Sequence, residues 1–264
     1  HLTGVLAARR IAAAQVEGAG LGSAHVTFRP SHVSGGQYVF DVQTAGSAML
    51  VLQTVLPPLF RADGHSTVTV RGGTHNPMGP PFDFFAESFL PALAKMGFRA
   101  NARLVRHGYF PAGGGEVVVD IEPATDLRPF DFRSPGDPVA LTARVISARL
   151  PDRVWENERR ALESLDLKFD AIERRDVTDS RGPGNCVIIA ADRGTGDRHR
   201  RSILTGFGER GKPSPVVVEE AAGWCRELLA TEAGVDRFLA DQLLIYLALA
   251  GGEMSEPQRA ELQR

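Results

Sequence analysis

Apolar residues follow two periods along the chain, and blocks of the two periods succeed one another. Helical spacing of apolar residues marks the segments 2–11, 45–59, 80–97, 153–164, 216–229 and 238–250. Strict alternation or short apolar runs predict strands at 25–30, 37–42, 66–71, 99–106, 116–121, 139–148, 168–174, 186–191 and 202–206. This order predicts an α/β (α+β) protein with helices layered on mixed sheets.

The order of the elements in the first half of the chain predicts one structural unit and one hairpin turn. Residues 37–123 run strand, helix, strand, helix, strand, strand, which predicts one β-α-β-α-β-β unit. The pair Gly35-Gly36 separates the strands 25–30 and 37–42, and a glycine pair between strands predicts a hairpin turn.

A change of composition follows the first unit. The stretch 126–138 is polar, holds three prolines and is typical of a linker. Apolar helical character like that of the first part returns only at 238–250. We therefore predict a discontinuous main domain, residues 1–135 and 231–264, interrupted by a smaller α/β domain at 136–230.

Composition narrows the class of protein. The 264 residues are 43% apolar, enough for a full core, and the formal net charge is −2. Proteins that coat nucleic acid are usually strongly basic, so any contact with nucleic acid should be local. No apolar run reaches the ~18 residues that span a membrane, which predicts no membrane partner. Cys186 and Cys225 lie far apart in unlike segments, which favours two buried free thiols in a reducing, cytoplasmic compartment.

Phosphate loops of the common types are absent from the sequence. No G-x-x-x-x-G-K-[ST] string occurs. The small residues Thr44-Ala45-Gly46-Ser47 precede the helix 45–59, where free amides could bind an anion or Thr44 or Ser47 could cap the helix. The cap is the favoured interpretation, because such caps are common.

Two apolar helices are interrupted by polar residues. Gln53 lies inside the first, and its amide either bonds a neighbouring backbone or contacts a ligand. In the last helix Asp241 and Gln242 follow Phe238 by one turn, so the three side chains could share one pocket. An aromatic ring there could stack on a base, and Asp241 could hold a hydrated cation or a ribose hydroxyl. A helix edge in solvent is an equal alternative.

Basic residues gather at two places. Arg106 and His107 lead into the triple glycine 113–115. Their side chains could bind a phosphate group, or they could lie at the solvated end of a strand, and the two interpretations are equally favoured. The run Arg198-His199-Arg200-Arg201 is interpreted as a solvated loop.

Taken together, these strings resemble RNA 3′-terminal phosphate cyclases. The matching strings are LVLQTVLP (50–57), GGT with NP (72–77), RHGYFPAGGGEV (106–117), GPGN (182–185), GERGK (208–212) and FLADQLLIYLALA (238–250). The resemblance implies tandem translation-initiation-factor-like β-α-β-α-β-β units with a smaller inserted α/β domain. It also implies a ligase reaction in RNA processing. A histidine takes AMP from ATP, the AMP passes to an RNA 3′-phosphate, and the vicinal 2′-hydroxyl attacks to give a 2′,3′-cyclic phosphate.

The resemblance further implies roles for individual residues. The ATP-binding positions are Gln53, Phe238, Leu239, Ala240, Asp241 and Gln242. The residues placed near the phosphates are His1, Arg106 and His107. A divalent ion, Mg²⁺ or Mn²⁺, would offset charge on the triphosphate.

Two elements of the family pattern are not found in these residues. A glycine-rich segment is expected before His1, and a nucleophilic histidine is expected shortly after the helix 238–250. None of the seven histidines fits that second position. We therefore expect a chain truncated at both ends, either a fragment or a degenerate gene product. The alternative function is a non-catalytic, cyclase-like protein that binds RNA or acts in ribosome assembly. A weaker alternative is an enolpyruvyl-transferase relative, which gives no reason for Phe238 and Gln242 to share a pocket.

Overall fold

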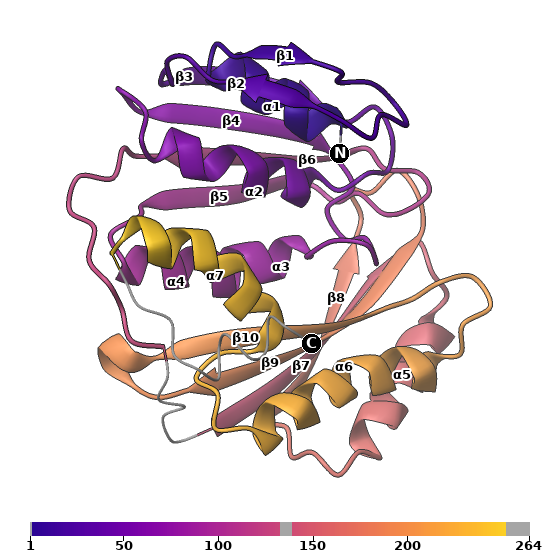
Figure 1. The fold of residues 1–264 in the computed structure, drawn as a ribbon. Coiled ribbons are helices and arrows are strands. Elements are labelled where there is room, and N and C mark those ends of the chain that lie inside the picture. The colour runs from indigo at the N-terminus through magenta and orange to yellow at the C-terminus, as the bar shows by residue number, and fades with distance from the viewer. Residues whose placement is uncertain (1, 133–138, 252–264) are drawn as a thin grey trace. The chain divides into compact units, whose positions relative to one another are not determined.

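The computed structural model describes residues 2–132 and 139–251, which form two compact units (Figure 1). The first unit comprises His1–Phe82 and Gly97–Leu127, and the second comprises Asp83–Met96 and Arg128–Arg264. The mixed α/β architecture confirms the predicted fold class. The predicted division into residues 1–135 with 231–264 and residues 136–230 stays a prediction.

The first unit is built on a four-stranded sheet in the order β3-β4-β6-β5. Its strands are β3 (Gly36–Asp41), β4 (Ser66–Gly72), β5 (Ala100–Arg106) and β6 (Gly115–Ile121). β3 and β4 are parallel, and β6 runs antiparallel to both β4 and β5. The predicted order strand, helix, strand, helix, strand, strand over residues 37–123 is confirmed along the chain, but most of the second helix, Asp83–Met96, belongs to the second unit.

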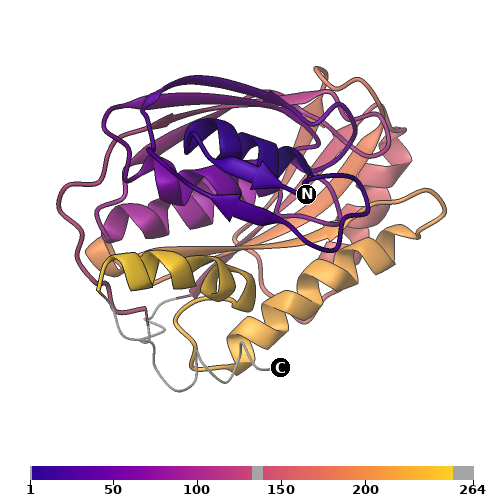
Figure 2. The ribbon, with the colours of Figure 1, turned by 45° about the horizontal axis from the view of Figure 1, so that its top comes forward.

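Two helices cover one face of this sheet (Figure 2). They are α1 (Leu2–Ile11) and α2 (Ala48–Leu59). Alternate residues of β4 and β6, among them Val68, Val70 and Val119, are fully buried. Gly4 allows α1 to approach α2 closely, because a Cβ atom at Gly4 would lie 3.2 Å from Oγ1 of Thr54.

The predicted hairpin at Gly35-Gly36 is wrong. β2 (Thr27–Arg29) pairs with β1 (Gln15–Glu17), a short strand that was not predicted. The glycines serve a different purpose. A Cβ atom on Gly35 would lie 2.3 Å from the carbonyl oxygen of Gly64, and Gly36 has a φ of 146°. The pair therefore permits a close approach to a second chain segment rather than a turn.

The second unit contains another four-stranded sheet, in the order β10-β9-β7-β8. Its strands are β7 (Val139–Ala148), β8 (Ala171–Val177), β9 (Gly184–Arg193) and β10 (Arg200–Phe207). β7 and β8 are parallel and are joined through α5 (Asp152–Glu163), whereas β9 is antiparallel to both of its neighbours. α5 and α6 (Ser214–Ala230) pack on one face and enclose an apolar core (Figure 1).

The other face of this second sheet carries helical segments of the same unit. α3 (Phe82–Phe84), a π-helical turn η1 (Phe85–Phe89) and α4 (Leu90–Lys95) form one continuous helix, in the segment predicted as helical. α7 (Arg237–Leu249) packs on η1, where the Phe89 and Tyr246 rings meet edge to face at 5.5 Å. No helix in the described ranges is long and apolar enough to cross a bilayer.

Candidate functional site

Three loops of the first unit meet at one end of its sheet. The backbone amide of Gly73, after β4, donates to Gly46 O at 2.8 Å, and Gly73 O accepts from Ala48 N at 2.8 Å. The amide of Thr74 donates to Gly108 O, also at 2.8 Å. The loops before α2, after β4 and between β5 and β6 therefore form one hydrogen-bonded cluster, which we call the glycine loop cluster (residues 44–47, 72–76 and 106–115).

Glycine is required in this cluster because the backbones touch. A Cβ atom on Gly108 would lie 2.4 Å from Gly72 O, and one on Gly115 would lie 2.6 Å from the Thr74 methyl carbon. Both distances are shorter than any real contact of a Cβ atom. The glycines at these positions thus reflect packing between loops.

A stack of three rings fills the interior of the cluster. His75 and His107 lie 5.2 Å apart and nearly parallel, and Tyr109 lies 5.5 Å from His75. All three residues are buried. His75 Nδ1 is also 2.8 Å from the hydroxyl of Thr74. His107, which the resemblance places near the phosphates, is therefore a buried member of this stack.

Arg106 lies at the edge of the same cluster. Its Nε donates to Gly114 O, and its Nη2 lies 4.0 Å from Glu116 Oε2. About a third of its side chain is exposed, at 34%, so the guanidinium retains donors that face solvent. His1, the third residue assigned to the phosphates, lies outside the described residues.

The N-terminus of α2 is capped by a side chain. Ser47 adopts an extended conformation, and its hydroxyl accepts a hydrogen bond from Leu50 N at 3.3 Å. Thr44 Oγ1 accepts from Gly46 N at 3.1 Å. The favoured interpretation of this segment as a helix cap is confirmed.

Gln53 lies on α2 and is partly buried. Its side-chain Nε2 is buried, and no acceptor within the described residues lies in hydrogen-bond range. The alternative in which this nitrogen bonds a neighbouring backbone is therefore wrong. A buried amide donor without an acceptor costs roughly 1–3 kcal/mol, so its retention needs a reason.

The predicted site residues of α7 lie in the second unit. Asp236 caps this helix by accepting from Leu239 N at 2.9 Å. Phe238 is 41% exposed and meets the Trp224 ring edge-on at 5.0 Å. Asp241 is exposed and accepts from Gln242 Nε2 at 3.3 Å.

The remaining two positions of this helix differ in exposure. Leu239 is buried, and Ala240 is partly exposed. The structure thus brings Asp241 and Gln242 into contact and leaves the Phe238 ring accessible one turn before them. The side chain of Leu239 points into the unit.

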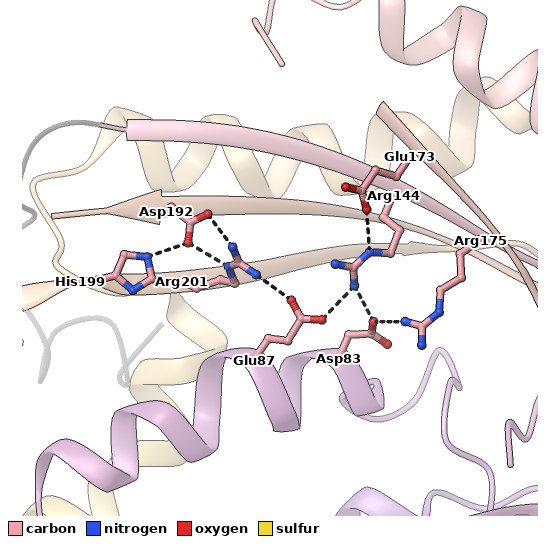
Figure 3. Close-up of polar contacts among 8 residues, drawn as sticks. All are labelled: Asp83, Glu87, Arg144, Glu173, Arg175, Asp192, His199 and Arg201. Carbon is pink, nitrogen blue, oxygen red and sulfur yellow. Dashed lines mark hydrogen bonds and ion pairs between the residues drawn. The ribbon is translucent and has the colours of Figure 1, made fainter. Parts of the chain in front are cut away.

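The sequence did not reveal an ion-pair network between the second sheet and the helix that begins at Phe82 (Figure 3). Arg144 Nη1, on β7, lies 2.9 Å from Asp83 Oδ1 and 2.9 Å from Glu87 Oε1. Arg201 on β10 continues the network, 3.0 Å from Glu87 Oε2. Asp83 is only 2% exposed, so its charge depends on these partners.

The network reaches the surface at the far end of β9 and β10. Asp192 accepts from Arg201 Nε at 2.8 Å and lies 3.0 Å from His199 Nε2 (Figure 3). Burial raises the pKa of Asp192, but the hydrogen bonds and charges of Arg201 and His199 together outweigh it, and the pKa is lowered overall. His199 and Arg201 are therefore held by an acid. The prediction that the whole run 198–201 is a solvated loop is wrong for Arg200 and Arg201, because both belong to β10 and Arg200 is buried.

A metal site made only of protein ligands is not found in the described residues. No group of three or more His, Cys, Asp or Glu side chains there is arranged to hold an ion. Asp241 offers one exposed carboxylate, which would suffice only for an ion that is also held by phosphates.

The known proteins to which this chain is similar carry the name of one family. The sequence model of the RNA 3′-terminal phosphate cyclase family matches residues 1–263. The chain is 41% identical over 253 residues to an RNA 3′-terminal phosphate cyclase of Pseudomonas fluorescens, covering 96% of this chain and 72% of that protein. It is 42% identical over 253 residues to that of Koribacter versatilis (96% and 70%) and 42% identical over 254 residues to that of Ralstonia nicotianae (95% and 71%).

Proposed function

Because the chain belongs to the RNA 3′-terminal phosphate cyclase family, we propose that it converts an RNA 3′-phosphate into a 2′,3′-cyclic phosphate with ATP. In this reaction a protein histidine displaces pyrophosphate from ATP and becomes linked to AMP. The RNA 3′-phosphate then takes the AMP, and the vicinal 2′-hydroxyl closes the ring as AMP leaves. The observation that carries the proposal is the family match over nearly the whole chain.

We propose Gln53 as a residue that contacts the adenosine of ATP. Its buried Nε2 has no acceptor within the described residues, and a nucleobase or ribose oxygen or nitrogen would supply one. The partner is thus provided by the ligand rather than by the fold. This accounts for an amide inside a helix that is otherwise almost entirely apolar.

On α7 we propose that Phe238 stacks on the base and that Asp241 and Gln242 bind polar groups of the nucleotide. The exposed ring of Phe238 is already held edge-on by Trp224, which limits its rotation. Leu239 and Ala240 would contribute through the backbone or by packing. Around the phosphates we propose Arg106, His107 and His1.

Further parts of the proposal concern the metal, the domains and the compartment. Mg²⁺ usually binds through one or two carboxylates together with substrate phosphates, so we propose that Mg²⁺ or Mn²⁺ arrives with ATP. We retain residues 136–230 as the inserted domain. Both cysteines are free and buried, which supports a reducing, cytoplasmic location.

The adenosine site is tested by replacing Gln53 with leucine. The variant should unfold at higher urea concentration, because a buried amide without a partner is removed. It should also bind ATP about tenfold more weakly, which corresponds to ~1.4 kcal/mol. Isothermal titration measures the affinity, and Thr54→Val on the same helix is the control. Unchanged ATP affinity in Gln53→Leu would remove Gln53 from the site.

The reaction is tested with the full-length gene product, ATP labelled on the α-phosphate, Mg²⁺ and an RNA that ends in a 3′-phosphate. We expect acid-labile protein-bound AMP and an RNA end that resists phosphatase. Binding of ATP and RNA without either product would instead support the non-catalytic, cyclase-like alternative. Absence of ATP binding would refute the proposed reaction.

A further inference from the structure

Asn76, in the glycine loop cluster, has a buried side-chain oxygen that the fold leaves without a donor. The residue is 7% exposed, and its Oδ1 makes no hydrogen bond with any of the described residues. A buried acceptor without a donor is unfavourable in the folded protein, because the same oxygen would be hydrogen-bonded in water. The first unit therefore contains, besides the buried Nε2 donor of Gln53, a buried acceptor that a ligand could satisfy.

The other atom of this amide fixes its orientation. Asn76 Nδ2 donates to Ala45 O, in the loop before α2. A Cβ atom on Gly73 would lie 1.9 Å from Nδ2, so the glycine makes room for the amide. Turning the amide over would place Oδ1 against the carbonyl oxygen of Ala45, where neither atom can donate. The atom without a partner is therefore the oxygen, which only accepts.

The turn that begins at Asn76 does not use this oxygen either. Gly79 N donates to Asn76 O at 3.2 Å, which closes a β-turn with Pro77 at its second position. The side chain of an asparagine at the start of a turn commonly bonds the backbone two residues on. That backbone amide belongs to Met78, and it does not donate to Asn76 Oδ1. The need for an asparagine side chain is thus not explained by the turn.

An exposed turn separates the Asn76 amide from solvent. Pro77 and Met78 are both exposed, and Met78 is 89% exposed. The turn rests on the start of α2, because a Cβ atom on Gly79 would lie 2.8 Å from Ser47 Oγ. Exposed loop segments open at a lower free energy than the sheet beneath them. A ligand that displaces this turn would therefore reach the amide.

The proposed reactants narrow the choice of donor. Phosphate oxygens are acceptors, so they do not suit Asn76 Oδ1. Amino groups occur on some bases only, whereas every ribonucleotide carries a 2′-hydroxyl that can donate. Arg106, at the edge of the same cluster, retains donors that face solvent and suit phosphate. Because a ribose lies between phosphate and base, its hydroxyl is the donor that fits this cluster.

We propose that Asn76 Oδ1 accepts a hydrogen bond from a ribose hydroxyl, so that the protein selects ribonucleotides over deoxyribonucleotides. The inference rests on the proposed function for the choice of ligand. Both proposed reactants carry the group. In the RNA it is the 2′-hydroxyl next to the terminal 3′-phosphate, and in ATP it is a hydroxyl of the ribose. The hydrogen bond is the same in either case, and the test distinguishes the two sources.

The test measures binding, so that it is separate from catalysis. RNAs that end in a 3′-phosphate and differ only in a terminal 2′-hydroxyl or 2′-hydrogen are titrated without ATP. AMP is compared in the same way with 2′-deoxy-AMP and 3′-deoxy-AMP. The parent protein should bind the hydroxyl form of the RNA or of AMP about three- to tenfold more tightly than the deoxy form. Asn76→Ala should bind the two forms equally. Because this preference is a ratio within one protein, a general disturbance of the loop cancels.

The matched control replaces another asparagine of the first unit. Asn101 is exposed on β5, so Asn101→Ala should keep the affinities and the preference of the parent. A preference that Asn76→Ala loses for RNA assigns the terminal ribose of the RNA to Asn76, and one that it loses for AMP assigns the ribose of ATP. The proposal is overturned if the parent binds neither ligand or shows no preference. A preference that survives in Asn76→Ala, or that Asn101→Ala also loses, overturns it as well.

The same measurements separate this site from the proposed reaction. A preference that depends on Asn76 in a protein that forms no cyclic phosphate would refute the reaction and leave the site standing. Cyclisation by a protein whose binding shows no such preference would do the reverse.

Discussion

Glu158 places a carboxylate inside the core of the second unit, and this makes stability depend on pH. The residue lies on α5, is 1% exposed and accepts a hydrogen bond from Asn185 Nδ2 at 3.0 Å. Burial raises its pKa from 4.5 to about 7, although the bond from Asn185 acts in the opposite direction. The protonated form is therefore the one that the folded state prefers.

The sign and size of the effect follow from this shift. The folded pKa lies above the unfolded value, so the folded state gives up the proton less readily. Stability is then highest below about pH 4.5 and declines as the pH rises through about 7. At 1.36 kcal/mol per pKa unit, the change from 4.5 to about 7 corresponds to a loss of about 3 kcal/mol.

Glu158→Gln should remove this penalty, because the glutamine oxygen can still accept from Asn185. The two tryptophans, Trp155 and Trp224, lie on α5 and α6 against the core of this unit, so their fluorescence reports its unfolding in urea. We expect the variant and the parent to be equally stable near about pH 4.5. The variant should be more stable by up to about 3 kcal/mol near about pH 8.5.

The control lies on the same helix. Glu163 is 48% exposed and pairs with Arg159, so Glu163→Gln should change stability little at any pH. Taking the difference between variant and parent cancels the titration of all other groups. A Glu158→Gln difference that stays constant between the two pH values would show that the carboxylate is not strained by burial, and the reasoning would fail.

Three further predictions concern packing, charge and thiols, with urea unfolding as the measurement for the first two. Gly206→Ala should lower the free energy of unfolding by about 1–3 kcal/mol, because its Cβ atom would lie 1.9 Å from a backbone carbonyl oxygen of α6. Gly223→Ala has open space around it and should raise the free energy of unfolding by about 0.5–1 kcal/mol. A gain in stability for Gly206→Ala, or a loss for Gly223→Ala, would contradict this packing. Asp83→Ala should lower the free energy of unfolding by about 3–5 kcal/mol, because it leaves guanidiniums without their buried partner. A loss below ~1 kcal/mol would show that stability does not depend on the network. Burial raises the pKa of Cys186 well above its usual value and the pKa of Cys225 to about 11. A thiol reagent at neutral pH should therefore label neither cysteine until the protein unfolds. Rapid labelling of both cysteines in the native protein would refute this.

The helices and most strands were predictable because their apolar residues keep a regular period over many positions. The segment 238–250, for example, agrees with α7 (Arg237–Leu249) to within one residue at each end. The Gly35-Gly36 hairpin failed because the strands on either side of these glycines, β2 and β3, pair with other strands and not with each other. β3 pairs with β4, beyond a helix, and β2 pairs with the three-residue β1, which is too short to show a period.

Part of the candidate site could likewise be predicted from the sequence, and part could not. Gln53 was noticeable because one amide interrupts an apolar run, which is a local signal. The pairing of Arg144 with Asp83 and Glu87 gave no such signal, because each of these residues alone resembles an ordinary surface charge. Their meeting depends on strand register and on which face a distant helix covers, and neither is written in the local pattern.

The outermost strand of the second sheet has a consequence for how the protein behaves at high concentration. β8 has a sheet partner on one side only within the described residues, so its other side offers free backbone groups to a strand from another molecule. Four consecutive charged residues occupy this strand, Glu173, Arg174, Arg175 and Asp176, and all four are exposed. Charged side chains on an open edge oppose strand addition and so limit aggregation. Replacing them with β-branched residues would remove this opposition and allow molecules to join edge to edge.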